Sequence, residues 1–269
     1  MPELPEVETI ARGLAVRVAG DVIETVWLGS KPEPLKSPAT EIEETLRSAK
    51  ILNVRRSGKH IVFDLQSLGG VTSAQWIVHL GMTGRLLVCS PETEFTKHTH
   101  AVLRLASGRE LRFIDPRRFG RLAVIKKFAP PGVEPLAVSP TEFAALFHHR
   151  KTPIKSALLN QKLLSGVGNI YADEALFRAG VRPRRRAASL TGDELRRLHK
   201  GLKQVLQEAI RLGGSSISDY VDSDGQEGFF QLKHRVYGRE GEPCRKCKTP
   251  IKRVVIAGRS SHYCPKCQK

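Results

Sequence analysis

The sequence is poor in aromatic residues and contains no long apolar run. Phe, Trp and Tyr together make up 6% of the 269 residues. No stretch of about 18 consecutive apolar residues occurs, which argues against a membrane-spanning helix. The first residues are acidic, whereas a secretory signal begins with basic residues and continues with apolar ones. Neither pattern of a membrane or exported protein is therefore present.

Acidic residues are scarce relative to basic ones. The chain has 27 Asp and Glu against 44 Lys and Arg, which gives a net charge of +17 and a pI near 10.0. A charge of this size favours a polyanionic partner, with nucleic acid as the first candidate and an anionic membrane surface as the second. The composition, with 40% hydrophobic residues, is globular, and the length allows two domains, each with its own core.

Cysteines are few, and four of the five are paired in sequence. Cys244 and Cys247 form one Cys-x-x-Cys pair, and Cys264 and Cys267 form a second after sixteen residues. Two such pairs supply four thiolates for one tetrahedral zinc ion, with no position left open for catalysis. We therefore expect one structural Zn²⁺, with a hairpin between the pairs that turns at Ala257-Gly258. Cys89 stands alone and is interpreted as a small core residue.

The first nine residues carry an unusual chemical possibility. Removal of Met1 leaves Pro2 with a free secondary amine, which can attack an aldehyde-like carbon and form an iminium. An α-amino group titrates near ~8, whereas a lysine titrates near ~10.4, so more of it is neutral at physiological pH. Glu3 places a carboxyl group beside it. The alternative is an ordinary capped helix start, because apolar residues then repeat at helical spacing: Val7, Ile10, Leu14 and Val18.

The rest of the first half predicts short strands separated by turn residues. This pattern favours an antiparallel β-sandwich, preceded by the N-terminal helix and containing a short helix over 41–48. Turn signals lie at Ser57-Gly58, Gly69-Gly70 and Ser107-Gly108, and residues 30–38 are expected to form a loop. The expected strands are 22–27, 51–56, 61–65, 76–80, 85–89, 101–105, 110–114 and 121–125.

Three turns in this half have residues that suit contact with nucleic acid. Lys59 lies at a basic hairpin tip, where the alternative is a solvated turn. Met82 stands between glycines and can enter a base stack, although a Met is more often a core residue. Arg117 and Phe119 are two apart and point to the same side of an extended segment. The alternative is that Phe119 belongs to the core and the arginines to the surface.

The second half predicts helices after a proline-rich linker. Thr141 is expected to cap a helix over 142–148, and Thr191 with Glu194 forms a capping box before a long amphipathic helix. Asn169 is expected at the N-cap of a helix after a glycine turn, which suits a phosphate, with Lys155 supplying charge. The alternative is an ordinary capped helix corner. Residues 215–230 are expected to form a loop.

Five separated blocks of this sequence resemble the formamidopyrimidine-DNA glycosylases. They are the N-terminal run over 2–9, the Gly-Lys hairpin, Asp-Pro-Arg-Arg-Phe-Gly over 115–120, the stretch from Leu158 to Phe177, and the tail with its two cysteine pairs. The stretch from Leu158 is similar to the family's helix–two-turn–helix motif, and it departs at Asn160, where the family usually has Asp. The resemblance implies an α+β protein with a catalytic β-sandwich over 1–131, a linker over 132–140, a helix–two-turn–helix domain over 141–232 and a zinc finger over 233–269.

The resemblance also implies roles for individual residues. The expected catalytic residues are Pro2, Glu3, Lys59 and Arg259. The expected residues for DNA binding are Glu6, Met82, His98, Arg117, Phe119, Arg150, Lys155 and Asn169. Met82, Arg117 and Phe119 would fill the void left by an extruded base, Glu6 would also help to fix the N-terminus, and the loop over 215–230 would close over that base.

The reaction that the resemblance implies is excision of oxidised purines followed by β,δ-elimination at the abasic site. The partner would be double-stranded DNA that contains oxidised bases or abasic sites, and no membrane would be bound. The protein would act as a monomer in the cytoplasm, associated with the nucleoid. Two alternatives remain open: an endonuclease VIII-like enzyme for oxidised pyrimidines, and a catalytically silent protein that binds DNA lesions.

Overall fold

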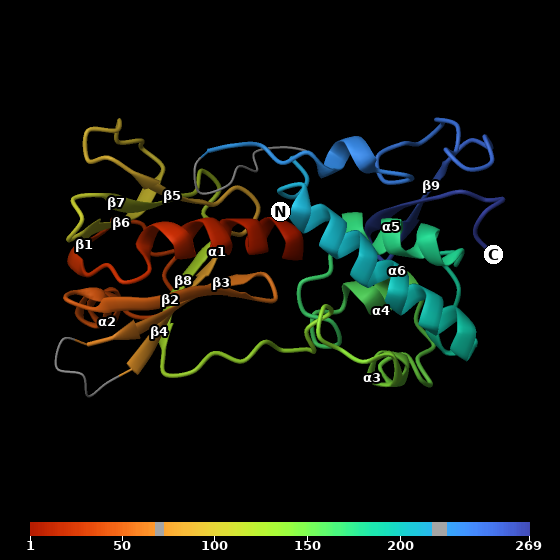
Figure 1. Cartoon of the computed structure of the whole chain (residues 1–269), viewed down its shortest axis with the longest axis horizontal. Helices are drawn as coiled ribbons and strands as arrows, with labels where there is room; N and C mark the ends of the chain where they lie inside the picture. Colours follow the sequence, from red (N-terminus) through yellow and green to blue (C-terminus); the bar gives the residue numbers. More distant parts are fainter. Residues whose placement is uncertain (68–72, 217–224) are drawn as a thin grey trace. The chain divides into compact units, whose positions relative to one another are not determined.

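The computed structural model describes residues 1–67, 73–216 and 225–269. The chain divides into two compact units (Figure 1). Unit 1 contains residues 1–129 and 213–229, and unit 2 contains 130–212 and 230–269. Each is described by itself below. Within the described ranges, no helix combines the length and the apolar character needed to cross a membrane.

Unit 1 is built on two antiparallel sheets, each with four strands among the described residues. One sheet has the order β1-β6-β7-β5 and the other β2-β3-β4-β8. The bounds are β1 Ile23–Leu28, β2 Lys50–Ser57, β3 His60–Gln66, β4 Ser73–His79, β5 Arg85–Cys89, β6 Thr99–Leu105, β7 Glu110–Ile114 and β8 Arg121–Ile125. The expected β-sandwich is confirmed, with strand ends that differ from the predicted ones by at most three residues.

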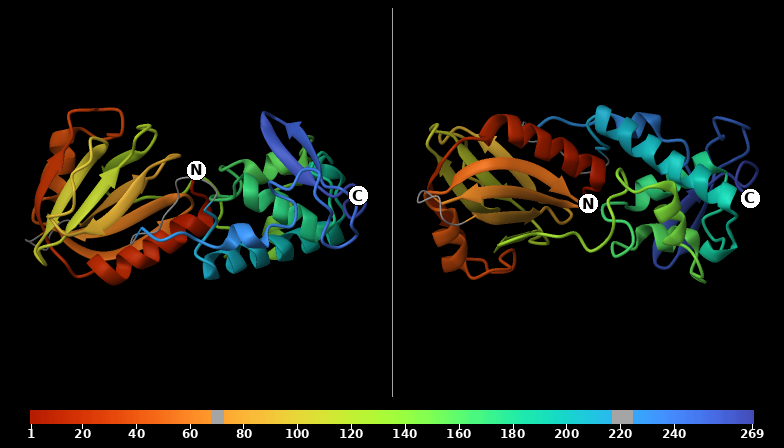
Figure 2. Two further views of the ribbon diagram at one scale, coloured as in Figure 1. Left: turned by 90° about the horizontal axis from the view of Figure 1, so that it is seen from above. Right: turned by 60° about the horizontal axis from the view of Figure 1, so that its bottom comes forward.

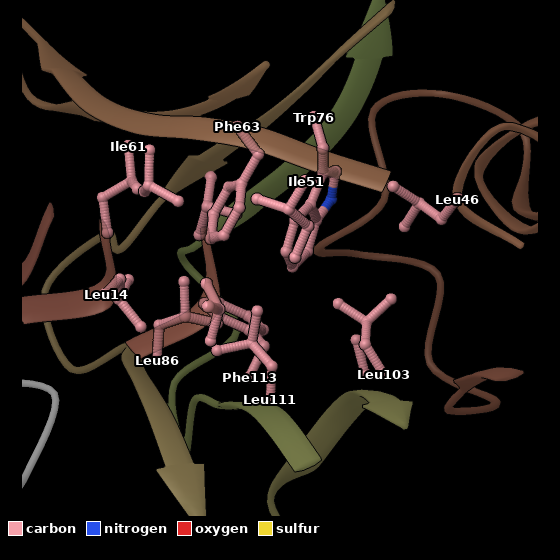
Figure 3. Close-up of a cluster of buried hydrophobic side chains, with 14 of the residues drawn as sticks. Leu14, Leu46, Ile51, Ile61, Phe63, Trp76, Leu86, Leu103, Leu111 and Phe113 are labelled. Atoms are coloured by element: carbon pink, nitrogen blue, oxygen red, sulfur yellow. The ribbon is translucent and has the colours of Figure 1, made fainter. Parts of the chain in front are cut away.

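The core of unit 1 lies between the two sheets. Phe63 and Trp76, from neighbouring strands of one sheet, stack with ring centroids 4.8 Å apart, and Phe113 and Leu111 face them from the other sheet (Figure 3). These side chains are at most 1% exposed, and burial of each large apolar side chain contributes about 1.5–3 kcal/mol. Side chains from the strands that the sequence predicted therefore fill this core.

Helix α1 (Leu4–Val18) lies along the sandwich and contacts β2 and β3 of one sheet and β5 of the other (Figure 2). Its buried face carries the apolar residues that predicted it, and Leu14 is fully buried. The short helix α2 covers Ala39–Leu46 and was predicted two residues too late. It ends because Arg47 leaves the helical conformation and Ser48 adopts a positive φ of 63°.

Unit 2 is mainly helical. Its helices are α3 Pro140–Ala145, α4 Ile154–Leu159, α5 Asn169–Ala179 and α6 Gly192–Arg211, with short 3-10 turns η1 Ala187–Ser189 and η2 Phe230–Lys233. The predicted start of α3 was wrong, because Ser139 and not Thr141 is the N-cap. Its hydroxyl accepts from the Glu142 N–H at 3.2 Å. The predicted capping box of Thr191 and Glu194 at the start of α6 is confirmed.

A two-stranded hairpin completes unit 2. Strand β9 (Lys252–Ile256) pairs with β10 (Arg259–Tyr263), and Ala257 and Gly258 form the turn with φ of 47° and 74°. Positive φ at both central residues gives the turn type whose twist matches that of the strands. The predicted hairpin is confirmed, and Arg259 is the first residue after its tip.

Three smaller expectations complete the comparison of sequence and fold. The turn expected at Gly69-Gly70 and the middle of the loop expected over 215–230 fall at 68–72 and 217–224, outside the described residues. Cys89 is only half-buried at the end of β5, so it is not the core residue that was expected.

Candidate functional site

Pro2 is close in sequence to two buried carboxylates in unit 1, and Met1 before it is 51% exposed. Pro2 is buried, and Glu3 and Glu6 are 5% and 2% exposed. Glu6 Oε2 accepts the Glu3 N–H at 2.8 Å, and Glu6 Oε1 accepts the Ser215 N–H at 2.8 Å. Gly214, with a φ of +83°, packs so closely that a Cβ there would lie 2.9 Å from Glu6 Cγ.

This arrangement bears on the two roles expected of Glu6. A side chain that is enclosed and accepts two backbone N–H groups holds the helix start and the Ser215 segment together. Glu6 is only 2% exposed, and its expected contact with DNA stays a prediction. The expectation that it fixes the N-terminus fits the observed bonds.

Lys59 lies in the two-residue turn between β2 and β3. Gly58 supplies a positive φ of 59° at the first turn position, which fits a hairpin turn that needs Gly there. Lys59 is 9% exposed. Arg56, three residues earlier, donates to Glu8 of α1 at 2.7 Å, and its guanidinium also reaches the Gly58 carbonyl at 3.2 Å. The hairpin tip is thereby fixed to the helix that begins beside Pro2.

Met82, Arg117 and Phe119 lie on two turns that touch through their backbones. Met82 is 43% exposed and Phe119 is 52% exposed, so neither is the core residue of the alternative interpretation. The Arg117 guanidinium lies over the Phe119 ring at 4.7 Å, a cation–π contact. The two side chains lie on the same side, as expected. The segment is a turn and not the expected extended one, because Arg118 between them has a φ of 57°. A Cβ on Gly81 would lie 2.5 Å from the Phe119 carbonyl carbon, which shows how closely the turns approach.

Two further residues expected to bind DNA have exposed or partly exposed side chains. His98 is half-buried and its carbonyl accepts the Asp115 N–H at 2.9 Å. Arg150 is exposed in unit 2, and its Nε donates to the Leu146 carbonyl at 2.6 Å. The structure places both on accessible surface without assigning them a ligand.

The glycine turn before α5 is held by a residue that the sequence did not single out. Gln161 Oε1 accepts the Gly166 N–H at 2.9 Å, and its Nε2 donates to the Val167 carbonyl at 2.8 Å. Asn160, the departure from the family pattern, uses Oδ1 to accept the Lys162 N–H at 3.0 Å. An Asp carboxylate accepts the same bond, so the amide preserves this corner.

Asn169 does not cap α5 as predicted. Gly168 is the N-cap, Asn169 is the first helical residue, and its Nδ2 donates to Ser260 Oγ at 3.2 Å. The first N–H groups of α5 still form the positive end of a helix that suits an anion. The prediction was right about the helix start and wrong about the residue that caps it.

Lys155 is fully buried, so its expected contact with a DNA phosphate stays a prediction that its surroundings do not support. Its Nζ lies 2.6 Å from Asp173 Oδ1 and donates to the Ser260 carbonyl at 2.6 Å. Asp173 Oδ2 accepts the His262 N–H at 2.8 Å. Lys155 of α4 and Asp173 of α5 therefore hold the backbone of β10 immediately beyond Arg259. A local sequence pattern could not show that this charge is paired inside the protein.

Lys155→Met is expected to destabilise the folded protein by about 3–5 kcal/mol, because it leaves the Asp173 carboxylate buried without its cation. Denaturant unfolding of the zinc-loaded protein measures this change. The double variant Lys155→Met/Asp173→Asn is expected to recover much of the loss, since Asn is neutral and still accepts the His262 N–H.

A direct phosphate contact by Lys155 predicts the opposite pattern. In that case Lys155→Met leaves stability unchanged and lowers the slope of log affinity against log salt by about one unit. Salt titration of binding to duplex DNA therefore distinguishes the two roles.

The chain that leads into the zinc hairpin is anchored by a buried carboxylate. Glu174 of α5 is fully buried and accepts the backbone N–H groups of Arg235, Val236 and Tyr237 at 2.9–3.0 Å. Burial raises the pKa of Glu174, and the three N–H groups oppose that shift. Neither this residue nor Asp173 was singled out from the sequence, since both read as ordinary positions of a helix.

The four cysteines of the tail converge as predicted. All four sulfur atoms lie within 4.8 Å of one another, with Cys244 Sγ 3.9 Å from Cys267 Sγ and Cys247 Sγ 3.4 Å from Cys264 Sγ. Four thiolates bound to one zinc at about 2.3 Å are separated by about 3.8 Å in a tetrahedron. The sulfur cluster therefore fits one structural Zn²⁺, and the expected cofactor is confirmed.

A β-sandwich with a buried N-terminal proline, a helix–two-turn–helix unit and a four-cysteine hairpin define a class of zinc-containing DNA glycosylases. Three family models match the chain. Their descriptions are the N-terminal domain of formamidopyrimidine-DNA glycosylase over residues 1–122, its H2TH domain over 131–221, and a zinc finger found in FPG and IleRS over 241–269. The chain belongs to the formamidopyrimidine-DNA glycosylase family, as the sequence predicted.

Full-length relatives support this assignment. The chain is 47% identical over 279 residues to formamidopyrimidine-DNA glycosylase of Solibacter usitatus and 44% identical over 283 residues to that of Gluconobacter oxydans, each with 100% coverage of both chains. The crystal structure of the MutM (Fpg) protein from Thermus thermophilus is 44% identical, with a TM-score of 0.87 over 99% of this chain and 98% of the other. The complex of Lactococcus lactis Fpg with DNA containing an abasic site is 31% identical, with a TM-score of 0.89 over 99% of each chain.

Proposed function

We propose that this DNA glycosylase and abasic-site lyase removes oxidised purines from duplex DNA, with Pro2 as the nucleophile. The observation that carries the proposal is the buried start of α1, where Pro2 adjoins the Glu3 carboxyl group and Glu6 fixes the backbone. Among related structures, MutM has been solved with DNA containing carbocyclic 8-oxo-G. A base must leave the stack before its sugar carbon can be reached.

The chemistry begins at the amine that removal of Met1 exposes. The Pro2 nitrogen attacks C1′ of the deoxyribose, the bond from C1′ to the base breaks, and the base leaves with the electron pair and takes up a proton. Glu3 donates a proton to the ring oxygen as the sugar opens, which leaves an iminium between Pro2 and C1′. The iminium acidifies the neighbouring C–H bond, so the 3′ phosphate and then the 5′ phosphate are eliminated.

Other residues of unit 1 would hold the lesion. Lys59, on a hairpin tied to α1 through Arg56 and Glu8, would bind the phosphate at the lesion and assist proton transfer. Met82, Arg117 and Phe119, exposed on touching turns, would fill the space that the extruded base leaves. His98 would contact DNA from its partly exposed position.

Unit 2 would bind the DNA backbone. Arg259 at the exposed hairpin tip, Arg150 and the N-terminal turn of α5 at Asn169 offer cations and N–H groups to phosphates. Lys155 is assigned to positioning β10 because of its burial. Zinc, when bound, supplies folding energy to the hairpin and takes no part in bond making. Binding through phosphates should weaken as salt rises.

The division into a catalytic sandwich over 1–131, a linker over 132–140, a helix–two-turn–helix domain over 141–232 and a zinc finger over 233–269 is part of this proposal. It is supported by the family models, although residues 213–229 cluster with unit 1. We also propose that the protein acts as a monomer. A location on the nucleoid, in the cytoplasm, follows from the substrate.

An endonuclease VIII-like preference for pyrimidines is the second candidate. The names of the full-length relatives and the set of Met82, Arg117 and Phe119 favour purines. Parallel excision assays on duplexes that carry 8-oxoguanine or an oxidised pyrimidine separate the two. A substantially faster reaction on the pyrimidine duplex would reverse the assignment.

Borohydride is expected to trap the wild-type protein covalently on 8-oxoguanine DNA, because it reduces the iminium to a stable amine. Gel electrophoresis of the adduct, with mass spectrometry of the linked peptide, measures this result and identifies Pro2. Binding of the lesion without an adduct or a strand break would support the silent DNA-binding alternative instead.

A further inference from the structure

Asp115 is a buried, highly connected polar residue of unit 1 that no role above uses. It directly follows β7, and its side chain is 0% exposed. Its N–H donates to the His98 carbonyl at 2.9 Å, and its carbonyl accepts from His100 Nε2 at 2.9 Å. These bonds fix its backbone to the start of β6, the strand next to β7, so the position from which its carboxylate extends is well defined.

The Asp115 carboxylate holds the turn that carries Met82. Oδ1 accepts from the Thr83 hydroxyl at 2.6 Å, a short bond of the kind expected for a charged acceptor. From the other side, His79 Nδ1 accepts the Gly81 N–H at 3.1 Å. Burial lowers the pKa of His79 to about 4, with smaller contributions from His60, Arg121 and Lys59, so this nitrogen stays unprotonated at neutral pH.

The same carboxylate holds the turn that carries Arg117 and Phe119. Oδ1 also accepts the Arg117 N–H at 3.2 Å, and Oδ2 accepts the Gly120 N–H at 2.7 Å. One buried side chain therefore bonds to both turns, on either side of the exposed residues. Burial of a carboxylate costs desolvation free energy, which these hydrogen bonds must compensate. A surface loop can form without such a buried group.

Glycines bring the two turns into direct backbone contact. A Cβ on Gly81 would lie 2.6 Å from the Gly120 nitrogen, and a Cβ on Gly120 would lie 2.4 Å from the Phe113 ring and 3.1 Å from Asp115 Oδ2. A side chain at Gly81 would push the two turns apart, and one at Gly120 would clash with the Phe113 ring. Met82 and Phe119, which are 43% and 52% exposed, thus extend from a closely packed backbone.

We propose that Asp115 is a positioning residue that holds Met82, Arg117 and Phe119 as one rigid wedge, and that this rigidity sets how efficiently a base is expelled from the stack. The inference rests on the proposed function, because it assumes that the three side chains enter the DNA. A wedge that is already ordered loses no conformational entropy when it enters the duplex, so more of its contact energy opens the base pair. The reaction at Pro2 itself does not use Asp115.

The experiment compares two substrates under single-turnover conditions. One duplex contains 8-oxoguanine paired with cytosine, and the other contains an abasic site, which has no base to unpair or unstack. Asp115→Asn keeps the side-chain shape but offers one acceptor oxygen in place of two. It is expected to slow excision of the paired lesion by about 10- to 100-fold and cleavage of the abasic site by no more than about 3-fold.

Substitutions at Thr83 provide a matched control that leaves Asp115 in place. Thr83→Val removes only the hydroxyl that binds Asp115 and should slow excision of the paired lesion by several-fold, whereas Thr83→Ser should restore it. 2-Aminopurine next to the lesion reports unstacking by its fluorescence, which should rise more slowly in Asp115→Asn and Thr83→Val. Melting temperatures, measured alongside, show that each variant is folded.

The possible results are distinct. Equal losses on both substrates in Asp115→Asn, with normal rates in Thr83→Val, would mean that Asp115 merely supports the fold, and unchanged excision in Asp115→Asn would also overturn the inference. If the wild-type protein neither cleaves nor becomes trapped on either duplex, the proposed function itself fails. Selective loss on the paired lesion supports the rigid wedge.

Discussion

An N-terminal extension that keeps Pro2 within the chain is expected to abolish strand cleavage, with a loss of at least about 10⁴-fold. In such a protein the Pro2 nitrogen is an amide whose lone pair is delocalised, so it cannot attack C1′. Pro2→Gly, after removal of Met1, still has an amine. Its rate of strand cleavage is expected to fall about 10²-fold, because the backbone becomes more flexible and the secondary amine becomes a primary one. Denaturing gels of cleaved abasic-site DNA measure both losses.

Binding provides the control for this prediction. Pro2→Gly should bind DNA with a reduced, unreactive abasic-site analogue within about three-fold of the wild-type affinity, because the proline nitrogen contributes to reaction more than to binding. Mass spectrometry of the purified N-terminus must first establish that Met1 has been removed. The nucleophile assignment is wrong if borohydride traps the extended protein as efficiently as the mature one, and Lys59, an amine at the turn fixed to α1, would then be the candidate to test.

The fold of unit 1 was predictable because its determinants are local. Short strand-forming segments lie between turn residues, and Gly58, in the turn between β2 and β3, has the positive φ that glycine adopts readily. The errors also have local causes. Ser139 precedes Pro140 and lies three residues before Glu142, which is a complete capping box, and the prediction chose Thr141 instead.

The individual site residues were predictable only where a motif is continuous in sequence. The cysteine pairs and the hairpin tips could be predicted without information on contacts between distant parts of the sequence. Lys155, by contrast, pairs with Asp173 on another helix and with the carbonyl of Ser260, 105 positions later in the sequence, so nothing near it indicates burial. Asp115 was read as part of a motif, but its bond to Thr83 spans 32 positions.

These long-range contacts have a common form. In each, a buried carboxylate accepts N–H or O–H groups from a segment that carries a functional residue, which is buried in the case of Pro2 and exposed in the others. Glu6 holds the chain after Pro2, Asp115 holds the turns of Met82 and Phe119, and Asp173 holds the strand after Arg259. An exposed side chain gains precision when its backbone is fixed by buried charge-assisted hydrogen bonds. Substitution of one of these acids should therefore impair function mainly by displacing the functional residue that it holds, and less through the change in net charge.

Removal of zinc is expected to unfold the hairpin of β9 and β10 and to lower the affinity for lesion DNA by at least about 100-fold. A structural zinc site contributes about 10–16 kcal/mol to the folding of small zinc domains, whereas an isolated two-stranded hairpin is marginal in water. The apolar cluster beneath the hairpin is small and consists of Phe177, Val236, Cys244, Ile251 and Cys264. Loss of the hairpin removes Arg259 from its held position at the tip, and with it a charge-assisted phosphate contact.

Two variants and a chelator test this prediction together. Cys264→Ser should lose zinc and affinity, while the matched control Cys89→Ser, at the half-buried free cysteine of β5, should keep both. Arg259→Ala should bind zinc normally and lose about 10- to 100-fold in affinity, because one charged hydrogen-bonding group is worth about 1.5–3 kcal/mol. Zinc content by atomic absorption and hydrogen exchange of β10 amides complete the measurement. Protection of those amides after chelation would show that contacts to Asp173 and Glu174, rather than zinc, hold the hairpin.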